Sequence, residues 1–249
     1  MRYPLLVIAF LTIPALCLAQ SSVSPAAIAA RLEAIAELRS QRITEHAPEL
    51  PDSAWRQAAA GEVVTGVSAV PGHKAKIGWG VAVMATSIDR LWAGLNDELQ
   101  HTELLGLGHI EIVQGTPCAD RRHVMMLLPL PIVSDRWWVI ENRYNTALAA
   151  QTGGRVRELT WTGLTDPSAA ALSAEALQKV DGAVPVTFNH GGWLLIDLDG
   201  EHTLGEYFSW SDPGGELPAG PTAAFAGATI AKTMRAMTHY ANTQKSTCE

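Results

Sequence analysis

The side chains that could do chemistry in this chain are its eight histidines and a few carboxylates. No histidines are paired at the spacing of metal ligands on a helix or a strand, whereas a zinc site needs three or four converging ligands. The sequence contains no Gly-x-Ser-x-Gly nucleophile motif and no phosphate-binding loop. Gly78-Trp79-Gly80 and Gly106-Leu107-Gly108 lack the third glycine and the strand-to-helix context of a dinucleotide site. We therefore expect no metal site.

Acid–base catalysis needs a proton donor or acceptor held beside the substrate. Asp97 and Glu98 stand near His101 and could form such a set, but a solvated helix face is the simpler interpretation. Three further candidates lie on predicted strands: His123, Glu206 and Tyr207. None of these residues forms a convincing set. An enzyme, such as a cyclase or dehydratase acting on a hydrophobic substrate, is therefore the alternative function.

Asp135 and Arg136 are the charged pair with the clearest possible role. Strand alternation sends their side chains to opposite faces, so they need not pair with each other. Arg136 could fix the start of its strand. It could also meet the polar group of an apolar ligand, because a buried guanidinium requires a partner.

The strand and the helix near the C-terminus are the elements around which the rest of the predicted fold is organised. Residues 203–210 alternate as a strand, Ser211–Gly215 is a strong turn signal, and a helix follows from about Pro221. The apolar stripe of this helix is made mostly of small residues and methionines: Ala223, Ala226, Gly227, Ile230, Met234, Met237 and Ala241. A sheet packed on such a helix either comes very close or leaves a space. Methionine surfaces could adapt to an irregular apolar guest in that space.

Upstream, seven or eight strands joined by short turns predict an antiparallel sheet. Helices that are segregated from these strands predict an α+β fold. Residues 20–60 are expected to form an N-terminal helical leader, and residues 61–249 one ligand-binding domain.

Two local signatures carry a resemblance to a known family. They are Pro131-x-x-Ser134-Asp135-Arg136-Trp137-Trp138 and Asp212-Pro213-Gly214-Gly215-x-Leu217-Pro218. The first signature stands before a middle strand and the second before the final helix. With this placement, the chain resembles the START family of lipid-transfer domains, within the helix-grip (SRPBCC) superfamily, over roughly residues 63–241. The resemblance implies a curved antiparallel sheet wrapped around a long C-terminal helix. It also implies a tunnel for one sterol, phospholipid or other apolar molecule, and no cofactor.

The chain departs from the family where the family often buries a charged residue. Along the strand that begins at Arg136, the residues on the face of Arg136 include Trp138 and Ile140 and end in Asn142. Arg143 would point to the other face. A neutral polar anchor is expected, which leaves the chemistry of the ligand open.

Aromatic and apolar side chains on the strands and the terminal helix could line such a tunnel. The candidate ligand-binding residues are Trp79, Met125, Arg136, Trp138, Ile140, Asn142, Trp161, Trp193, Tyr207, Trp210, Ile230, Met234 and Met237. Packing in the core is the alternative role for each tryptophan.

Residues 1–19 have the layout of a cleaved secretory signal peptide, with Arg2 before an apolar run and small residues at the end. An uncleaved membrane anchor is the alternative. Cleavage would change the formal net charge from −7 to −8, because Arg2 is the only charged residue removed. An acidic chain without a Lys/Arg cluster is a poor candidate for nucleic acid. Cys118 and Cys248 could form a disulfide, but the sequence does not decide this.

The leading interpretation is a periplasmic or secreted protein for lipid binding and lipid transport. Transient contact with a membrane is possible. The identity of the ligand and the oligomeric state stay open.

Overall fold

The computed structural model describes the backbone of residues 23–212, 214 and 219–248, and their side chains except those of 219–227. The predicted signal peptide and most of the turn signature before the last helix lie outside the described residues. The strands are β1 (Val64–Ser68), β2 (Ile77–Met84), β3 (His109–Gln114), β4 (Arg121–Leu128), β5 (Arg136–Tyr144), β6 (Val156–Gly163), β7 (Val184–Pro185), β8 (Phe188–Asp197) and β9 (Thr203–Asp212). The helices are α1 (Pro25–Ala34), α2 (Ala36–Arg39), α3 (Asp52–Ala59), α4 (Ile88–Leu95), α5 (His101–Leu105), α6 (Thr146–Gln151), α7 (Ala174–Lys179) and α8 (Ala219–Thr243), with 3₁₀ turns η1 (Glu98–Gln100) and η2 (Pro167–Ala169).

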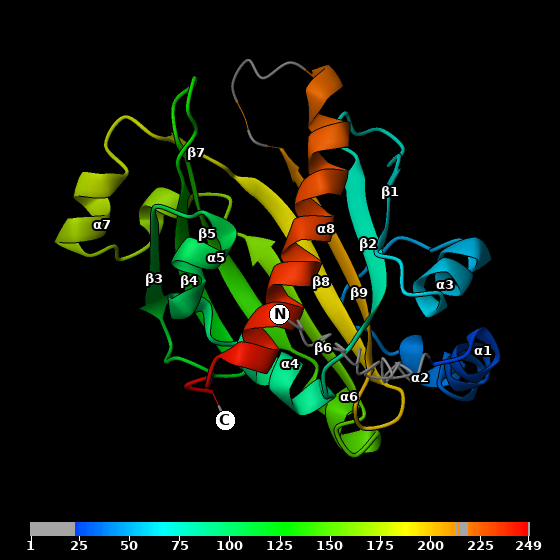
Figure 1. Ribbon diagram of the computed structural model, residues 1–249. Coiled ribbons are helices and arrows are strands. Elements are labelled where there is room, and N and C mark those ends of the chain that lie inside the picture. The colour runs from blue at the N-terminus through cyan, green and yellow to red at the C-terminus, as the bar shows by residue number, and fades with distance from the viewer. Residues whose placement is uncertain (1–22, 213, 215–218, 249) are drawn as a thin grey trace, which may run out of the picture.

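The described strands form one curved, unclosed sheet in the order β1-β2-β9-β8-β6-β5-β4-β3 (Figure 1). Neighbours along this path pair antiparallel, and the short β7 pairs with β5 in parallel. α8 lies across the concave face of the sheet. This arrangement confirms the predicted α+β class and the predicted curved sheet around the C-terminal helix.

Gly80 lets α8 come close to the sheet around Ile230 and Met234. A Cβ on Gly80 of β2 would lie 2.6 Å from Ile230 Cγ2 and 2.9 Å from Met234 Sδ. Gly205 of β9 makes room for Met84 instead, since a Cβ there would lie 2.7 Å from Met84 Sδ and 3.8 Å from Met234 Cε. The small-residue stripe allowed either close packing on the sheet or a space between helix and sheet. Around Ile230 and Met234, the helix packs closely.

α4 packs beside α8 and continues the same core. Ser87 caps α4 by accepting a hydrogen bond from the Arg90 amide, as its sequence position predicts. The apolar stripe of α4 is buried with Met237 and Ala241 of α8. No helix in the described part of the chain is long and apolar enough to cross a bilayer.

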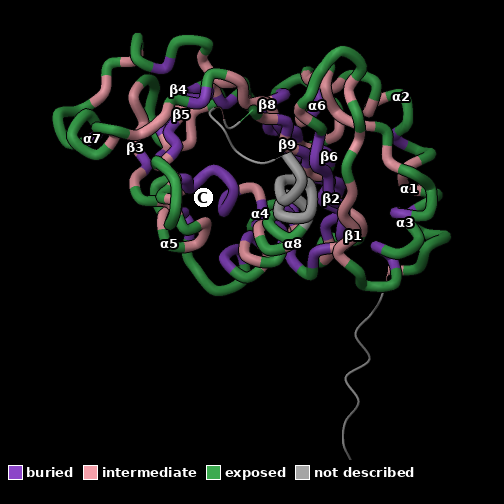
Figure 2. Tube along the Cα trace, turned by 90° about the horizontal axis from the view of Figure 1, so that it is seen from above, coloured by how far each residue is buried: buried purple, intermediate pink, exposed green. Residues whose placement is uncertain are grey.

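The N-terminal helices cover the opposite, convex face of the sheet (Figure 2). Ile28, Ile35 and Ala58 are buried in one cluster with Trp79 and Phe208 from β2 and β9. The segment predicted as a helical leader thus forms part of the core on this face.

Two buried carboxylates hold the N-terminal segment to the sheet. Glu158 of β6 accepts hydrogen bonds from Arg42 Nε at 3.0 Å, the Ile43 amide at 2.8 Å and Asn145 Nδ2 at 2.9 Å. Glu206 of β9 pairs with Arg39 and with Arg42 Nη1, the latter at 3.1 Å. Burial raises the pKa of Glu206, although the nearby Arg39 and Arg42 act in the opposite direction. The pairing neutralises charges that would be costly to bury alone.

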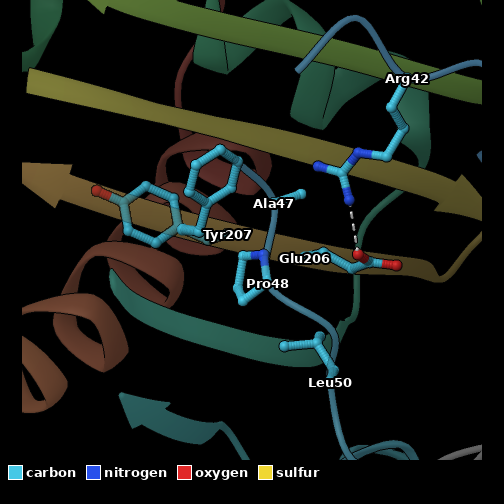
Figure 3. Close-up of a pocket in the computed structure, with 7 residues that line it drawn as sticks. Arg42, Ala47, Pro48, Leu50, Glu206 and Tyr207 are labelled. Atoms are coloured by element: carbon cyan, nitrogen blue, oxygen red, sulfur yellow. Dashed lines mark hydrogen bonds and ion pairs between the residues drawn. The ribbon is translucent and has the colours of Figure 1, made fainter. Parts of the chain in front are cut away.

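A small pocket lies beside this cluster, where the N-terminal segment crosses β9 (Figure 3). Its volume is about 10 Å³, which is room for about one water molecule. Its lining residues are Arg42, Ala47, Pro48, Leu50, Glu206, Tyr207 and Phe208. A lipid-sized guest does not fit here.

Candidate functional site

Strand register decides which side chains face α8. Gly80 faces the helix, and its register partner on β9 is Tyr207. Tyr207 is opposite Trp193, and Trp193 is opposite Leu159. Following the same phase across β6, β5 and β4 defines the concave surface. Its members include Arg122, Val124, Met126, Arg136, Trp138, Ile140, Asn142, Tyr144, Leu159, Trp161, Trp193 and Tyr207.

Several apolar side chains of this concave surface keep access to solvent. α8 packs mainly against β1, β2 and α4, at one side of the sheet. Met126, Trp138, Trp161 and Tyr207 lie on the same face of the sheet and are only half-buried. Contiguous apolar surface that keeps access to solvent is typical of a binding site for a hydrophobic guest.

Trp161 is held in place on this surface by a hydrogen bond and by close packing on the neighbouring strand. Its Nε1 donates to Asn189 Oδ1 at 3.0 Å, and its ring covers Gly191, where a Cβ would lie 2.0 Å from the ring. The Tyr207 ring centroid lies 4.6 Å from that of Trp193 and 5.8 Å from that of Trp161. Burial raises the pKa of Tyr207 to about 12. Its phenol is therefore neutral at physiological pH and can donate a hydrogen bond.

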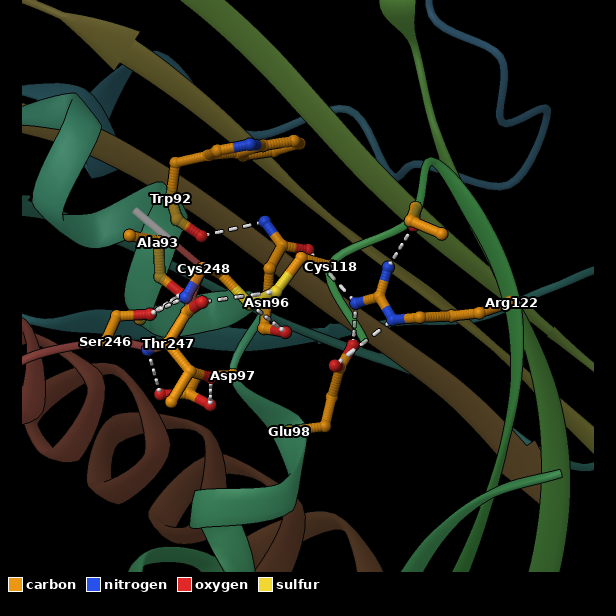
Figure 4. Close-up of a disulfide and its surroundings, with 12 residues drawn as sticks. Trp92, Ala93, Asn96, Asp97, Glu98, Cys118, Arg122, Ser246, Thr247 and Cys248 are labelled. Atoms are coloured by element: carbon orange, nitrogen blue, oxygen red, sulfur yellow. Dashed lines mark hydrogen bonds and ion pairs between the residues drawn. A yellow bond between two sulfur atoms is a disulfide. The ribbon is translucent and has the colours of Figure 1, made fainter. Parts of the chain in front are cut away.

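A buried charged network closes the end of the concave surface near α4 (Figure 4). The Arg122 side chain has no exposed area, and that of Glu98 is 4% exposed. Arg122 Nε donates to Glu98 Oε2 at 3.1 Å, and its Nη2 reaches both Glu98 Oε1 and Asn96 Oδ1. Its Nη1 donates to the Ala119 carbonyl and the Tyr144 hydroxyl, each at 2.7 Å. The guanidinium is thus fully hydrogen-bonded, as its burial requires.

Asn142 joins this network as the expected polar side chain on the concave face. Its Nδ2 donates to Glu98 Oε1 at 2.8 Å. Burial raises the pKa of Tyr144 to about 12 and lowers the pKa of Arg122. The sequence predicted a neutral anchor at Asn142, but the structure adds a charged pair next to it. Arg122 alternates with the apolar Val124 and Met126 on β4, which is the sequence signal that could have revealed it.

The prediction that Asp97, Glu98 and His101 form a solvated helix face is wrong. All three side chains are buried, with exposures of 3–4%. His101 Nε2 lies 2.8 Å from the Gly94 carbonyl, and burial lowers its pKa. Asp97 accepts hydrogen bonds from Tyr240 and Thr247, and the His101 ring packs edge-on against Tyr240. These contacts depend on a distant part of the sequence.

The C-terminal tail is fixed by a disulfide between Cys118 and Cys248, whose Cα atoms are 5.4 Å apart. This settles the pairing that the sequence left open. Cys118 precedes β4, so the bridge joins the end of the chain to the loop beside the Arg122 network.

The structure brings most of the predicted ligand-binding residues together. On the concave face or on α8 lie Arg136, Trp138, Ile140, Asn142, Trp161, Trp193, Tyr207, Ile230, Met234 and Met237. The other three do not share this surface: Trp79 and Trp210 pack with the N-terminal helices, and Met125 packs with Ala176 of α7. The prediction that these three side chains line the concave face was wrong. Strand alternation shows that neighbouring residues lie on opposite faces, but it does not show which face meets α8.

Arg136 ties the start of β5 to the chain that follows β9. It is buried, and it donates to the Ser134 carbonyl and, at 3.2 Å, to the Gly214 carbonyl. Asp135 accepts a hydrogen bond from the Leu130 amide at 2.9 Å, on the other side of the strand. These contacts give both residues a structural role.

Two of the acid–base candidates lie on the convex face. His123 Nε2 is 3.1 Å from Glu141 Oε2, and Glu206 belongs to the N-terminal ion-pair cluster. Tyr207 alone among these candidates faces the concave surface. Among the described residues, no group of three His, Cys, Asp or Glu side chains could hold a metal ion.

No family model and no curated protein sequence matches this chain. Solved structures do resemble it. A STAR-related lipid transfer protein from Xanthomonas axonopodis (fragment 25–204) is 18% identical, covering 72% of this chain and 93% of its own, with a TM-score of 0.59. Human StAR-related lipid transfer protein 5 is 16% identical, covering 87% and 97%, with a TM-score of 0.59. Human STARD10 is 11% identical, covering 80% and 83%, with a TM-score of 0.57. At these identities the likeness establishes the fold.

Proposed function

Because this chain has the helix-grip fold of the START lipid-transfer domains, we propose that it binds and transfers a hydrophobic small molecule, most simply a lipid. The guest lies between α8 and the concave face of the sheet. The observation that carries the proposal is the set of half-buried apolar side chains on that face, above all Met126, Trp138 and Trp161.

Burial of the guest supplies the driving force for binding. Removing about 300 Å² of its apolar surface from water contributes roughly 7 kcal/mol before the entropic costs of association. The neutral hydroxyl of Tyr207 can orient a polar group of the guest. Since Arg122 and Glu98 neutralise each other, they add no net charge to the surface. Arg136, the other arginine on this face, donates to the Ser134 and Gly214 carbonyls, and we propose that the guest is a neutral lipid.

Binding and transfer are favoured over the cyclase or dehydratase alternative. Turnover requires an acid or base at the substrate. Of the three candidates, Tyr207 alone faces the proposed guest, whereas His123 and Glu206 lie across the sheet from it and each is paired with another side chain. A single phenol does not form an acid–base set.

The proposed location is the periplasm or the extracellular space. The Cys118–Cys248 disulfide supports this, because disulfides persist in oxidising compartments. The layout of residues 1–19 as a signal peptide supports it independently.

Two adjacent tryptophans allow a matched test of the ligand face. Trp138 lies on the concave face, whereas Trp137 is buried on the convex face. We expect Trp138→Leu to weaken binding of a fluorescent neutral lipid analogue about tenfold, or about 1.4 kcal/mol. Trp137→Leu should lower thermal stability but change the Kd by less than about twofold, because it removes core packing instead of ligand contact. Equal losses of affinity in the two variants would contradict the proposed site.

Transient membrane contact is proposed for the loop between β4 and β5. Ile132 is 93% exposed and Val133 is 42% exposed. The Arg136–Gly214 hydrogen bond holds the base of this loop beside Gly214. An exposed isoleucine at a loop tip can enter the interfacial region of a bilayer.

We expect Ile132→Asp to slow lipid transfer from phosphatidylcholine vesicles about fivefold, because a carboxylate disfavours insertion. Binding of a lipid analogue in solution should be unchanged. Leu177→Asp is the control, since Leu177 is 57% exposed on α7. Membrane contact at the β4–β5 loop is wrong if the two variants transfer lipid at the same rate.

A further inference from the structure

The residues that follow α8 are held at several points. Ser246 Oγ donates to the Ala93 carbonyl at 2.9 Å. Thr247 donates to the Asp97 carboxylate through its amide at 3.1 Å and through its hydroxyl at 2.7 Å. Cys248 closes the disulfide with Cys118 across a sequence separation of 130 residues. We call Ser246–Cys248, together with this disulfide, the C-terminal clamp (Figure 4).

The clamp determines how Asp97 is hydrogen-bonded. Asp97 is 3% exposed, and its third donor is the Tyr240 hydroxyl at 2.8 Å. Burial by itself raises the pKa of Asp97, but hydrogen bonds from Thr247 and Tyr240 outweigh this effect and hold the pKa below its ordinary value. Two of the three donors belong to the clamp. Without them, a buried carboxylate would keep one donor, which is costly.

The clamp also adjoins the Arg122 network on two sides. Asp97 stands between Asn96 and Glu98, and both neighbours accept hydrogen bonds from Arg122. On the other side, Cys118 is followed by Ala119, whose carbonyl accepts from Arg122 Nη1. Movement at either half of the disulfide therefore reaches the polar end of the concave surface within one or two residues.

We propose that the C-terminal clamp is redox-sensitive, so that reduction of Cys118–Cys248 loosens the polar end of the ligand-binding surface and weakens ligand binding. The reductant is a dithiol. Its first thiolate attacks one sulfur, the other cysteine leaves as a thiolate, and a mixed disulfide forms. Its second thiol displaces the remaining cysteine. Two electrons and two protons pass to the two cysteines, and the dithiol becomes a cyclic disulfide. The ligand half of this proposal rests on the proposed function.

Amide hydrogen exchange tests the clamp independently of any ligand. In the oxidised protein, amides of residues 93–98 and 240–248 should be protected. Dithiothreitol should raise their exchange rates by about tenfold or more, because local opening becomes easier. Amides of residues 203–210 in the central sheet serve as the internal reference. Unchanged exchange at residues 93–98 after complete reduction overturns the proposal.

The Cys118→Ser/Cys248→Ser variant controls for the reductant itself. It should exchange like the reduced wild type, and dithiothreitol should not change it further. Reduced and alkylated wild-type protein gives the same comparison without a substitution.

Titration with the fluorescent neutral lipid analogue tests the ligand half. The wild-type Kd should rise about fivefold on reduction, whereas that of the double variant should not respond to dithiothreitol. Faster exchange with an unchanged Kd overturns the coupling to the ligand, while the proposed function stands. Absence of binding to the oxidised protein overturns the proposed function and the ligand half together, and the exchange result still decides whether the clamp opens.

Discussion

Replacing Glu98 by leucine is expected to lower the free energy of unfolding by about 3–5 kcal/mol, because it leaves a buried guanidinium without its counter-ion. Arg122 would lose the acceptors of its Nε and of part of its Nη2, and Asn142 would lose its partner as well. In a chain of this length, such a loss lowers the melting temperature by roughly 6–20 °C. Thermal and denaturant unfolding of the oxidised protein measure it.

The matched control is Glu103→Leu, at an exposed glutamate on α5. Its free energy of unfolding should change by less than about 0.5 kcal/mol. The double variant Glu98→Leu/Arg122→Met should be more stable than Glu98→Leu alone, since it removes the uncompensated charge together with its partner. A Glu98→Leu variant as stable as the Glu103→Leu control would show that the Arg122 network is not a buried charged pair in solution.

Glu158→Leu is expected to destabilise the convex side of the protein by a similar amount, about 3–5 kcal/mol. Glu158 is fully buried and accepts from Arg42, the Ile43 amide and Asn145. A leucine satisfies none of these donors. The N-terminal segment should then detach more readily from the sheet. Unfolding experiments give the stability, and limited proteolysis within residues 40–50 reports the detachment.

Glu201→Leu is the control for this prediction, because Glu201 is exposed in the turn before β9. It should show wild-type stability and wild-type resistance to protease. If Glu158→Leu lowered stability without faster cleavage in residues 40–50, the ion-pair cluster would stabilise the sheet but would not hold the N-terminal segment.

The fold could be predicted because its signals are local. Strand alternation, turn residues and the periodicity of the last helix each occupy a few neighbouring positions, and together they specify an antiparallel sheet with a terminal helix. The helix cap at Ser87 is a signal of the same kind.

The sequence shows which residues share a face of each strand, but it does not show which face meets α8. Trp79 and Trp138 both alternate with other large apolar residues, yet they lie on opposite faces of the sheet. The face that meets α8 is the one on which Gly80 leaves room for Ile230 and Met234. That packing is a property of the assembled fold.

The buried polar groups were the hardest to predict, because their partners are far apart in sequence. Arg122 finds Glu98 at a separation of 24 residues, and Arg39 finds Glu206 at a separation of 167. Which of many charged residues become buried depends on which loops meet. Asp97 shows this most clearly, since its burial depends on the last residues of the chain.

The central claim is that the concave face beneath α8 holds a neutral hydrophobic molecule. Native mass spectrometry of the oxidised protein, after incubation with vesicles of a mixed neutral and anionic lipid extract, tests it most directly. The account predicts a complex of one neutral lipid with one chain, and loss of most of this complex in Trp138→Leu but not in Trp137→Leu. Recovery of the unliganded chain alone would contradict the account.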